Sequence, residues 1–219
     1  MRVAIVGGNG QIAQLLHPLL LAEGHTPVAL VRREEQRAGL EAVGAELRLL
    51  DIENADVGGF AAAFDECSAV VFSAGGGPDG NIERKRTVDL EGALKSIEAS
   101  ERLGIRRLVQ VSAIDVDSPV ADAAGEVWKA YVEAKRDADA ALRASTLAWT
   151  ILRPGRLTDD PATGLVALGP DVTRADVTRA DVAAVLAAVL DRPDTVGKQW
   201  NLVGGDVPIA QAVDAAARS

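Results

Sequence analysis

A glycine-rich segment near the N-terminus constrains the fold of this chain more than any other feature. Residues 3–13 read VAIVGGNGQIA, so a short β-branched run stops at Gly7 and a turn with two further glycines follows. Apolar residues then recur at helical spacing from Ile12 to Leu20. This order predicts a strand, a tight turn and a helix. The first turn of such a helix offers unpaired N–H groups and the positive end of its dipole to a diphosphate.

The spacing Gly7-x-x-Gly10-x-x-Ala13 favours a dinucleotide site over an ordinary loop, which is the alternative. Glycine adopts positive φ with little strain, and it lets the backbone approach a phosphate closely. A glycine pattern alone is weak evidence, but here a strand precedes it and a helix follows it.

Strand and helix signals alternate along the whole chain. The strand candidates are nearly continuous apolar runs, at residues 3–6, 28–31, 46–50, 69–73, 108–112, 150–153 and 199–203. Segments with helical periodicity lie between them, at 11–23, 34–43, 57–64, 87–103, 127–144, 180–190 and 209–217. The alternation predicts an α/β fold with a doubly wound parallel sheet. Ligands of such sheets bind beyond the carboxyl ends of the strands.

The composition and net charge of the chain argue against several kinds of partner and cofactor. With 219 residues the chain suits one domain, and its net charge of −9 argues against nucleic acid or an anionic membrane as a partner. Cys67 is the only cysteine, which excludes an internal disulfide and fits a reducing cytosol. The sequence lacks a long apolar span and a signal peptide, so we expect a cytoplasmic protein. Neither His17 nor His25 has metal-ligand spacing, and we predict no metal.

Arginines follow the second predicted strand, where an NAD site would place an acidic residue. Arg32 and Arg33 stand where the 2′-phosphate of NADP would lie, and guanidinium groups pair well with phosphate. The pattern favours NADP over NAD. The alternative is a solvated basic pair that neutralises Glu34 and Glu35.

Two further strand ends carry candidates for cofactor binding. Asp51 and Ile52 follow the third strand and are placed to flank an adenine, although Asp51 could equally cap a helix. Ser73, Ala74 and Gly75 end the fourth strand, and their small side chains leave room for sugar and diphosphate. A flexible loop is the alternative for this glycine-rich stretch.

The single tyrosine, Tyr131, lies four residues before Lys135 in a predicted helix. Positions i and i+4 share a helix face, so the phenol and the ammonium project side by side. A neighbouring positive charge lowers the pKa of a tyrosine, and a phenol so tuned can exchange a proton with a carbonyl or alcohol oxygen. The alternative is a chance pair on an amphipathic helix.

These motifs occur in the order of a known family. The motifs are Gly7-x-x-Gly10-x-x-Ala13, Ser73-Ala-Gly-Gly, Val88-Asp-Leu-Glu-Gly-Ala93, Arg107-Leu-Val-Gln-Val-Ser112, Tyr131-x-x-x-Lys135 and Leu152-Arg-Pro-Gly155. Together they resemble an atypical short-chain dehydrogenase/reductase, from the compact NAD(P)H-binding branch related to extended epimerases and NmrA-like proteins. The resemblance covers essentially the whole chain and implies a Rossmann-type fold.

The resemblance also implies roles for single residues. It makes Tyr131 the acid/base, Lys135 the ligand of the nicotinamide ribose, and Pro154 and Gly155 the cradle of the carboxamide. The diphosphate loop would comprise Gly7, Gly8, Asn9, Gly10, Gln11 and Ile12. Arg32 and Arg33 would bind the 2′-phosphate, Asp51 and Ile52 the adenine, and Ser73, Ala74 and Gly75 the ribose and diphosphate.

One departure from the family pattern concerns the catalytic hydroxyl. Ser112 is the only hydroxyl at the end of the fifth strand, whereas many relatives place it one or two positions later, at Ala113 or Ile114 in this chain. Ser112 is therefore a catalytic candidate whose register is open.

The expected protein is a single domain over residues 1–219 in which 156–177 forms a small substrate lobe. It would transfer hydride from NADPH to a small carbonyl, quinone or flavin acceptor. A sugar epimerase or dehydratase and a non-catalytic NADP(H) redox sensor are the alternatives. Ala-rich helices around Ala93 and Ala184 could form a homodimer face, and Thr178 is expected to cap a helix with Asp181 at N3.

Overall fold

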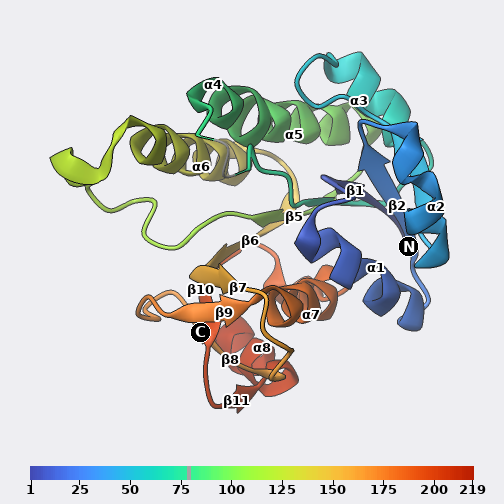
Figure 1. Cartoon of the computed structure of the whole chain (residues 1–219). Helices are drawn as coiled ribbons and strands as arrows, with labels where there is room; N and C mark the ends of the chain where they lie inside the picture. The colour runs from blue at the N-terminus through green and yellow to red at the C-terminus, as the bar shows by residue number, and fades with distance from the viewer. Residues whose placement is uncertain (78–79) are drawn as a thin grey trace.

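A computed structural model describes residues 1–77 and 80–219, and it contains a nine-stranded sheet between two layers of helices (Figure 1). The strand order is β11 (Val207–Pro208), β8 (Leu165–Gly169), β10 (Lys198–Gly204), β6 (Ala148–Pro154), β5 (Arg107–Val111), β4 (Ala69–Phe72), β1 (Arg2–Val6), β2 (Thr26–Val31) and β3 (Glu46–Leu49). The seven strands from β10 to β3 pair in parallel and coincide with the seven predicted ones. The predicted doubly wound, Rossmann-type sheet is confirmed.

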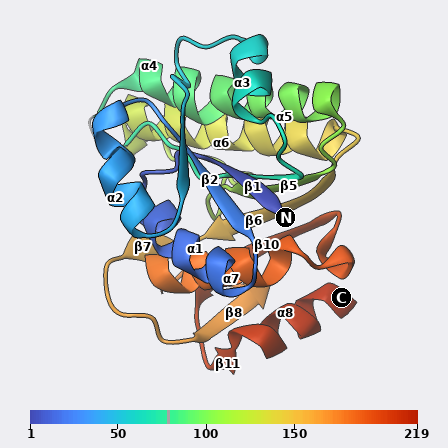
Figure 2. The same cartoon turned by 90° about the vertical axis from the view of Figure 1, so that its right-hand side faces the viewer.

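The helices divide between the two faces of the sheet, as the two views in Figures 1 and 2 agree. One face carries α1 (Gln11–Ala22), α7 (Arg179–Leu190) and α8 (Ile209–Arg218), and the other carries α3 (Val57–Ala63), α5 (Glu91–Leu103) and α6 (Glu126–Ala144). The short helix α2 (Arg37–Ala42) packs against β3 at the sheet edge. Three 3₁₀ turns complete the helical segments, at Glu34–Gln36, Asp122–Ala124 and Pro193–Thr195.

The helix predicted over 87–103 differs from the observed one at its start. Helical backbone begins with α4 (Ile82–Arg84), continues through a π-helical turn (Lys85–Leu90) and only then becomes α5. Apolar periodicity follows the 3.6-residue repeat of an α-helix, so it does not report a wider π turn. This π turn brings two charged residues to the site described below.

The side chains of strand β1 pack alternately into the hydrophobic cores on the two faces of the sheet. Val3 and Ile5 contribute to the core under α1, α7 and α8, whereas Ala4 and Val6 contribute to the core under α3, α5 and α6. All four side chains are fully buried. Alternate side chains of a strand point to opposite faces, so a central parallel strand is apolar at every position.

The segment 156–177, predicted as a small substrate lobe, is partly built into the main sheet. Strand β8 pairs with β10 in antiparallel register, while β7 (Arg156–Thr158) and β9 (Asp176–Thr178) form a separate two-stranded parallel sheet. The use of this segment by a substrate stays a prediction.

The predicted cap of α7 is confirmed. The Thr178 hydroxyl accepts a hydrogen bond from the Asp181 backbone N–H at 2.9 Å. The Asp181 carboxylate in turn accepts from the backbone N–H groups of Thr163 and Gly164. The helix start therefore anchors the loop before β8.

Candidate functional site

Two adjoining pockets lie at the carboxyl ends of the parallel strands. The first, of about 570 Å³, lies between the glycine loop after β1 and the ends of β2 and β3. The second, of about 830 Å³, lies between α6 and the ends of β5 and β6. They share the wall residues Ile12, Ser73, Ala74, Gly75, Gly77, Leu157 and Arg179, so one extended ligand can occupy both.

The glycine loop has the geometry that a diphosphate requires. Gly7 has φ of +83°, and Gly10 precedes α1 without any side chain capping the helix. The N–H groups of the first turn are therefore available to an anion. Of the six residues predicted for this loop, Gly7, Asn9, Gly10, Gln11 and Ile12 line the first pocket. Gly8 is buried behind it, where a Cβ would lie 2.6 Å from the Ala29 Cα.

His17 holds this loop from behind. Its side chain is fully buried in α1, and its Nε2 lies 2.7 Å from the Gly8 carbonyl oxygen. Because a carbonyl oxygen only accepts hydrogen bonds, Nε2 carries the proton. Burial lowers the pKa of His17, so the ring is neutral at physiological pH.

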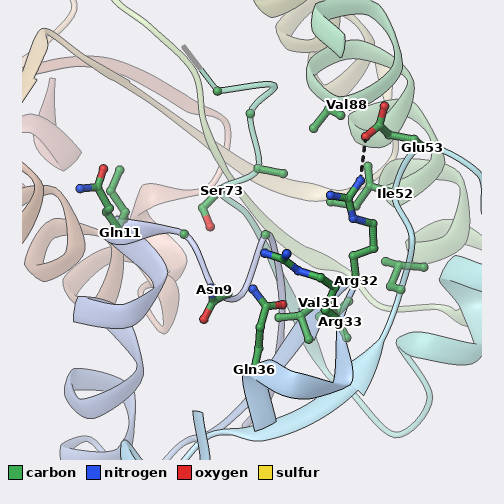
Figure 3. A pocket seen from close by; sticks show the side chains of 18 of the residues that line it. Asn9, Gln11, Val31, Arg32, Arg33, Gln36, Ile52, Glu53, Ser73 and Val88 are labelled. Atoms are coloured by element: carbon green, nitrogen blue, oxygen red, sulfur yellow. Dashed lines mark hydrogen bonds and ion pairs between the residues drawn. The ribbon is translucent and has the colours of Figure 1, made fainter. Parts of the chain in front are cut away.

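Arg32 and Arg33 lie side by side at the far end of the first pocket (Figure 3). Arg32 reaches Glu53, with an N–O distance of 3.5 Å, and the same carboxylate lies 3.3 Å from Arg84. Arg33 lines the pocket beside Arg32. The described wall contains four arginines and two acidic residues, Asp51 and Glu53, and one of the arginines, Arg179, pairs with Asp159 outside the wall. The adjacent guanidinium groups of Arg32 and Arg33 suit a phosphate.

The other predicted residues of the first pocket also lie in its wall. Asp51 accepts hydrogen bonds from the side chain and backbone of Asn54, which lower its pKa, and so it caps a turn rather than a helix. Ile52 lies beside it. The Ser73 hydroxyl donates to the Val6 carbonyl at 3.3 Å. Glu53 was not among the residues predicted from the sequence. The only signal for it is its position two residues after Asp51, just beyond β3.

The second pocket brings together all the catalytic candidates. Tyr131, Lys135 and Ser112 line it together with Pro154 and Gly155. Gly155 has no room for a side chain, since a Cβ there would lie 1.9 Å from the Ala175 carbonyl oxygen.

Lys135 is held by a buried carboxylate that sequence reasoning missed. Its Nζ lies 3.2 Å from Asp89 Oδ1 and 3.3 Å from the carbonyl oxygens of Ala74 and Val111. Asp89 is 0% exposed, and its other oxygen, Oδ2, accepts a hydrogen bond from the Gly76 N–H at 2.8 Å. Although burial alone would lower the pKa of Lys135, the Asp89 charge raises it, and the lysine is a cation.

The prediction that Lys135 lowers the pKa of Tyr131 is wrong for the net shift. The Lys135 charge does act in that direction, but burial of the phenol outweighs it, and the charges of Asp89 and Asp139 add to the rise. The pKa of Tyr131 therefore lies above its ordinary value. The phenol is protonated at neutral pH.

Ser112 belongs to a buried polar network. Its hydroxyl donates to Asp139 at 2.8 Å, and the same carboxylate accepts from Gln110 and Arg153. Arg153 also pairs with Asp117 at 2.6 Å. The Ser112 hydroxyl lies at the pocket wall and is already hydrogen-bonded to Asp139 of α6. Its catalytic role stays a prediction.

Within the described part of the chain, no three His, Cys, Asp or Glu side chains are grouped to hold a metal ion. No helix in residues 1–77 or 80–219 combines the length and the apolar character needed to cross a membrane.

Comparison with known proteins agrees with this geometry. The family model described as NAD(P)H-binding matches residues 7–193. A Bacillus subtilis protein named as the uncharacterized sugar epimerase YhfK is 41% identical over 214 residues, which covers 97% of this chain and 99% of that protein.

Solved structures match over the same length. A putative NAD-dependent epimerase/dehydratase from Bacillus halodurans has a TM-score of 0.91 at 38% identity, covering 98% of this chain and 99% of that one. The oxidoreductase ylbE from Lactococcus lactis has a TM-score of 0.85 at 25% identity, with 100% and 98% covered. The predicted resemblance to proteins related to epimerases and dehydratases is thereby confirmed, and the chain belongs to the NAD(P)H-binding family.

Proposed function

We propose that this protein is an NADP-dependent oxidoreductase of the short-chain dehydrogenase/reductase type that reduces a small carbonyl, quinone or flavin acceptor. One observation carries the proposal. Tyr131 and Lys135 lie in the wall of a pocket that is continuous with a glycine-loop pocket rich in arginine. The geometry fits a nicotinamide end at Tyr131 and a phosphate-bearing end at Arg32 and Arg33.

The residues would divide the work as follows. The uncapped first turn of α1 binds the diphosphate, and Arg32 with Arg33 binds the 2′-phosphate. NADPH, when bound, supplies a hydride. Tyr131 donates its proton to the developing oxyanion of the acceptor, and its raised pKa keeps that proton in place at neutral pH. Lys135 contributes positive charge beside the phenol, and its ribose contact is part of the proposal.

The test is loss of nicotinamide absorbance with NADPH and a panel of quinones, flavins and small aldehydes. Tyr131→Phe removes the proton donor from the acceptor's side of the site, so turnover should fall by about two to four orders of magnitude. The affinity for NADPH, measured by fluorescence titration, should stay within about twofold of the wild type. Loss of NADPH binding in the variant, or unchanged turnover, would contradict the role of Tyr131.

A non-catalytic NADP(H) sensor is the second candidate, because the Ser112 hydroxyl already donates to Asp139. NADPH binding without turnover on any acceptor would favour it. The names of the Bacillus relatives suggest a third candidate, a sugar epimerase or dehydratase. Such enzymes regenerate their cofactor in each cycle, so nicotinamide that stays with the purified protein, together with conversion of a nucleotide sugar, would favour that reaction.

A further inference from the structure

Among the residues that the structure describes, the charges around the second pocket are paired with one exception. Its three arginines each pair with an aspartate that lies outside the pocket wall. Glu126 pairs with Lys129, and Lys135 pairs with Asp89. Lys85 also lines the pocket, and among residues 1–77 and 80–219 no carboxylate forms an ion pair with it. The described wall residues and their partners therefore carry one positive charge in excess.

Lys85 is a buried cation beside the proposed proton donor. Its side chain is 5% exposed, and its Nζ donates to the Gly77 carbonyl oxygen and lies 6.0 Å from the centre of the Tyr131 ring. A buried ammonium without a counter-ion is strongly unfavourable, because one carbonyl replaces little of its hydration. A lysine of this kind gains most when a ligand brings the missing negative charge.

The phosphates of the cofactor do not meet this need. Lys85 lines only the second pocket, whereas the glycine loop, Arg32 and Arg33 line the first. The nicotinamide end that would enter the second pocket carries no anionic group near Tyr131. The missing charge is therefore that of the acceptor.

We propose that the acceptor is a small organic monoanion whose carboxylate binds Lys85 while its carbonyl lies at Tyr131. A single unpaired ammonium matches a single negative charge. The Lys85 Nζ lies 6.0 Å from the centre of the Tyr131 ring, so the carboxylate and the reducible carbonyl of the acceptor lie at the same end of the acceptor. The apolar wall of Ile114, Val127, Trp128 and Leu157 accommodates the carbon skeleton. The proposal rests on the proposed reductase function.

Phenylglyoxylate and its methyl ester are a suitable pair of probes, because they share one ketone and differ in one charge. Phenylglyoxylate would take a hydride from NADPH at its ketone carbon, and the displaced π pair would take a proton from Tyr131 at oxygen. The products are mandelate and NADP⁺, and solvent returns the proton to Tyr131. The kinetic measure is the ratio of kcat/KM for the acid to kcat/KM for the ester.

Lys85→Met removes the charge and keeps the length of the side chain. We expect it to lower that ratio at least tenfold relative to the wild type, while Lys85→Arg, which keeps the charge, retains a preference for the acid. Lys198→Met is the matched control, because it removes one positive charge from β10, away from the pocket wall and its ion pairs, and it should leave the ratio unchanged. Equal ratios in the Lys85→Met and Lys198→Met proteins would overturn the proposal.

Calorimetric binding of mandelate to the cofactor-free protein separates this proposal from the reductase function. We expect Lys85→Met to weaken mandelate binding at least tenfold and Lys198→Met to leave it unchanged. Lys85-dependent binding without turnover of any acceptor would refute the reductase and leave the anion site standing. Turnover with no dependence on Lys85 in either measurement would refute the anion site and leave the reductase standing.

Discussion

The buried ion pair between Asp89 and Lys135 makes a quantitative prediction about stability. Asp89→Asn keeps the shape of the side chain and an oxygen that can accept the Gly76 N–H, but it removes the charge that faces Lys135. Lys135 would then be a buried cation held only by two carbonyl oxygens. The substitution therefore tests one electrostatic contact with little change in packing.

The geometry sets the size of the effect. At the observed 3.2 Å, with an effective dielectric constant of about 20, the attraction is about 5 kcal/mol. Removal of one partner from a buried ion pair costs about 3–5 kcal/mol in other proteins, which is the same range. For a domain of this size, such a loss lowers the Tm by roughly 10 °C.

Urea denaturation of four proteins measures the contact: wild type, Asp89→Asn, Lys135→Met and the double variant. Each single variant leaves one buried charge without its partner, whereas the double variant leaves none. The double variant should therefore lose less free energy of unfolding than the two single variants lose in sum, and the difference should be about 2 kcal/mol or more. Glu98→Gln, which breaks the exposed pair with Arg102, is the control and should cost less than about 1 kcal/mol.

Two results would refute this reasoning. One is a loss below about 1 kcal/mol in Asp89→Asn, which would mean that the carboxylate contributes no more than a surface charge does. The other is strict additivity in the double variant, since it would mean that the two charges do not act on each other.

Three further substitutions test other parts of the site. Arg32→Ala with Arg33→Ala should weaken NADPH at least tenfold more than NADH in fluorescence titrations, since only NADPH carries the 2′-phosphate, whereas Arg37→Ala, outside the pocket, should affect neither. Equal weakening of both cofactors would show that Arg32 and Arg33 are a solvated surface pair and do not bind the 2′-phosphate. Because burial lowers the pKa of His17 from 6.5, the unfolded state binds more protons than the folded state below about pH 6.5. The free energy of unfolding should therefore decrease as the pH is lowered through this range. His17→Gln should flatten that part of a urea-denaturation pH series; an unchanged slope would assign it to other groups. Gly8→Ala should destabilise the fold by about 1–3 kcal/mol, because the new Cβ would lie 2.6 Å from the backbone of β2; a neutral change would show that the loop can shift.

The sheet and the glycine loop were predictable because their signals are local. A buried parallel strand is apolar at every position, so β1 and β4 stand out as short apolar runs without any knowledge of their neighbours. Strand β8 was missed because its pairing depends on β10, which lies far along the chain. The two-residue strand β11 is defined only by its antiparallel pairing with β8, and two residues are too few to show a periodic pattern.

Part of the pocket lining was predictable from the sequence, and its electrostatics were less so. Tyr131 and Lys135 were found because i and i+4 positions share a helix face. The direction of the Tyr131 shift depends on burial and on Asp89, which comes from a different helical segment. Ser112 likewise meets Asp139 only through the packing of α6 on β5.

Lys85 and Asp89 lie four residues apart on one π-helical turn, yet the structure gives them opposite effects on stability. Asp89 neutralises a buried lysine, so the folded state depends on its charge. Lys85 contributes a buried charge that no described carboxylate neutralises, so Lys85→Met should leave the Tm unchanged or raise it. A residue that a protein keeps against its own stability is characteristic of a functional site. A lower Tm in Lys85→Met would show instead that the ammonium holds the fold through the Gly77 carbonyl.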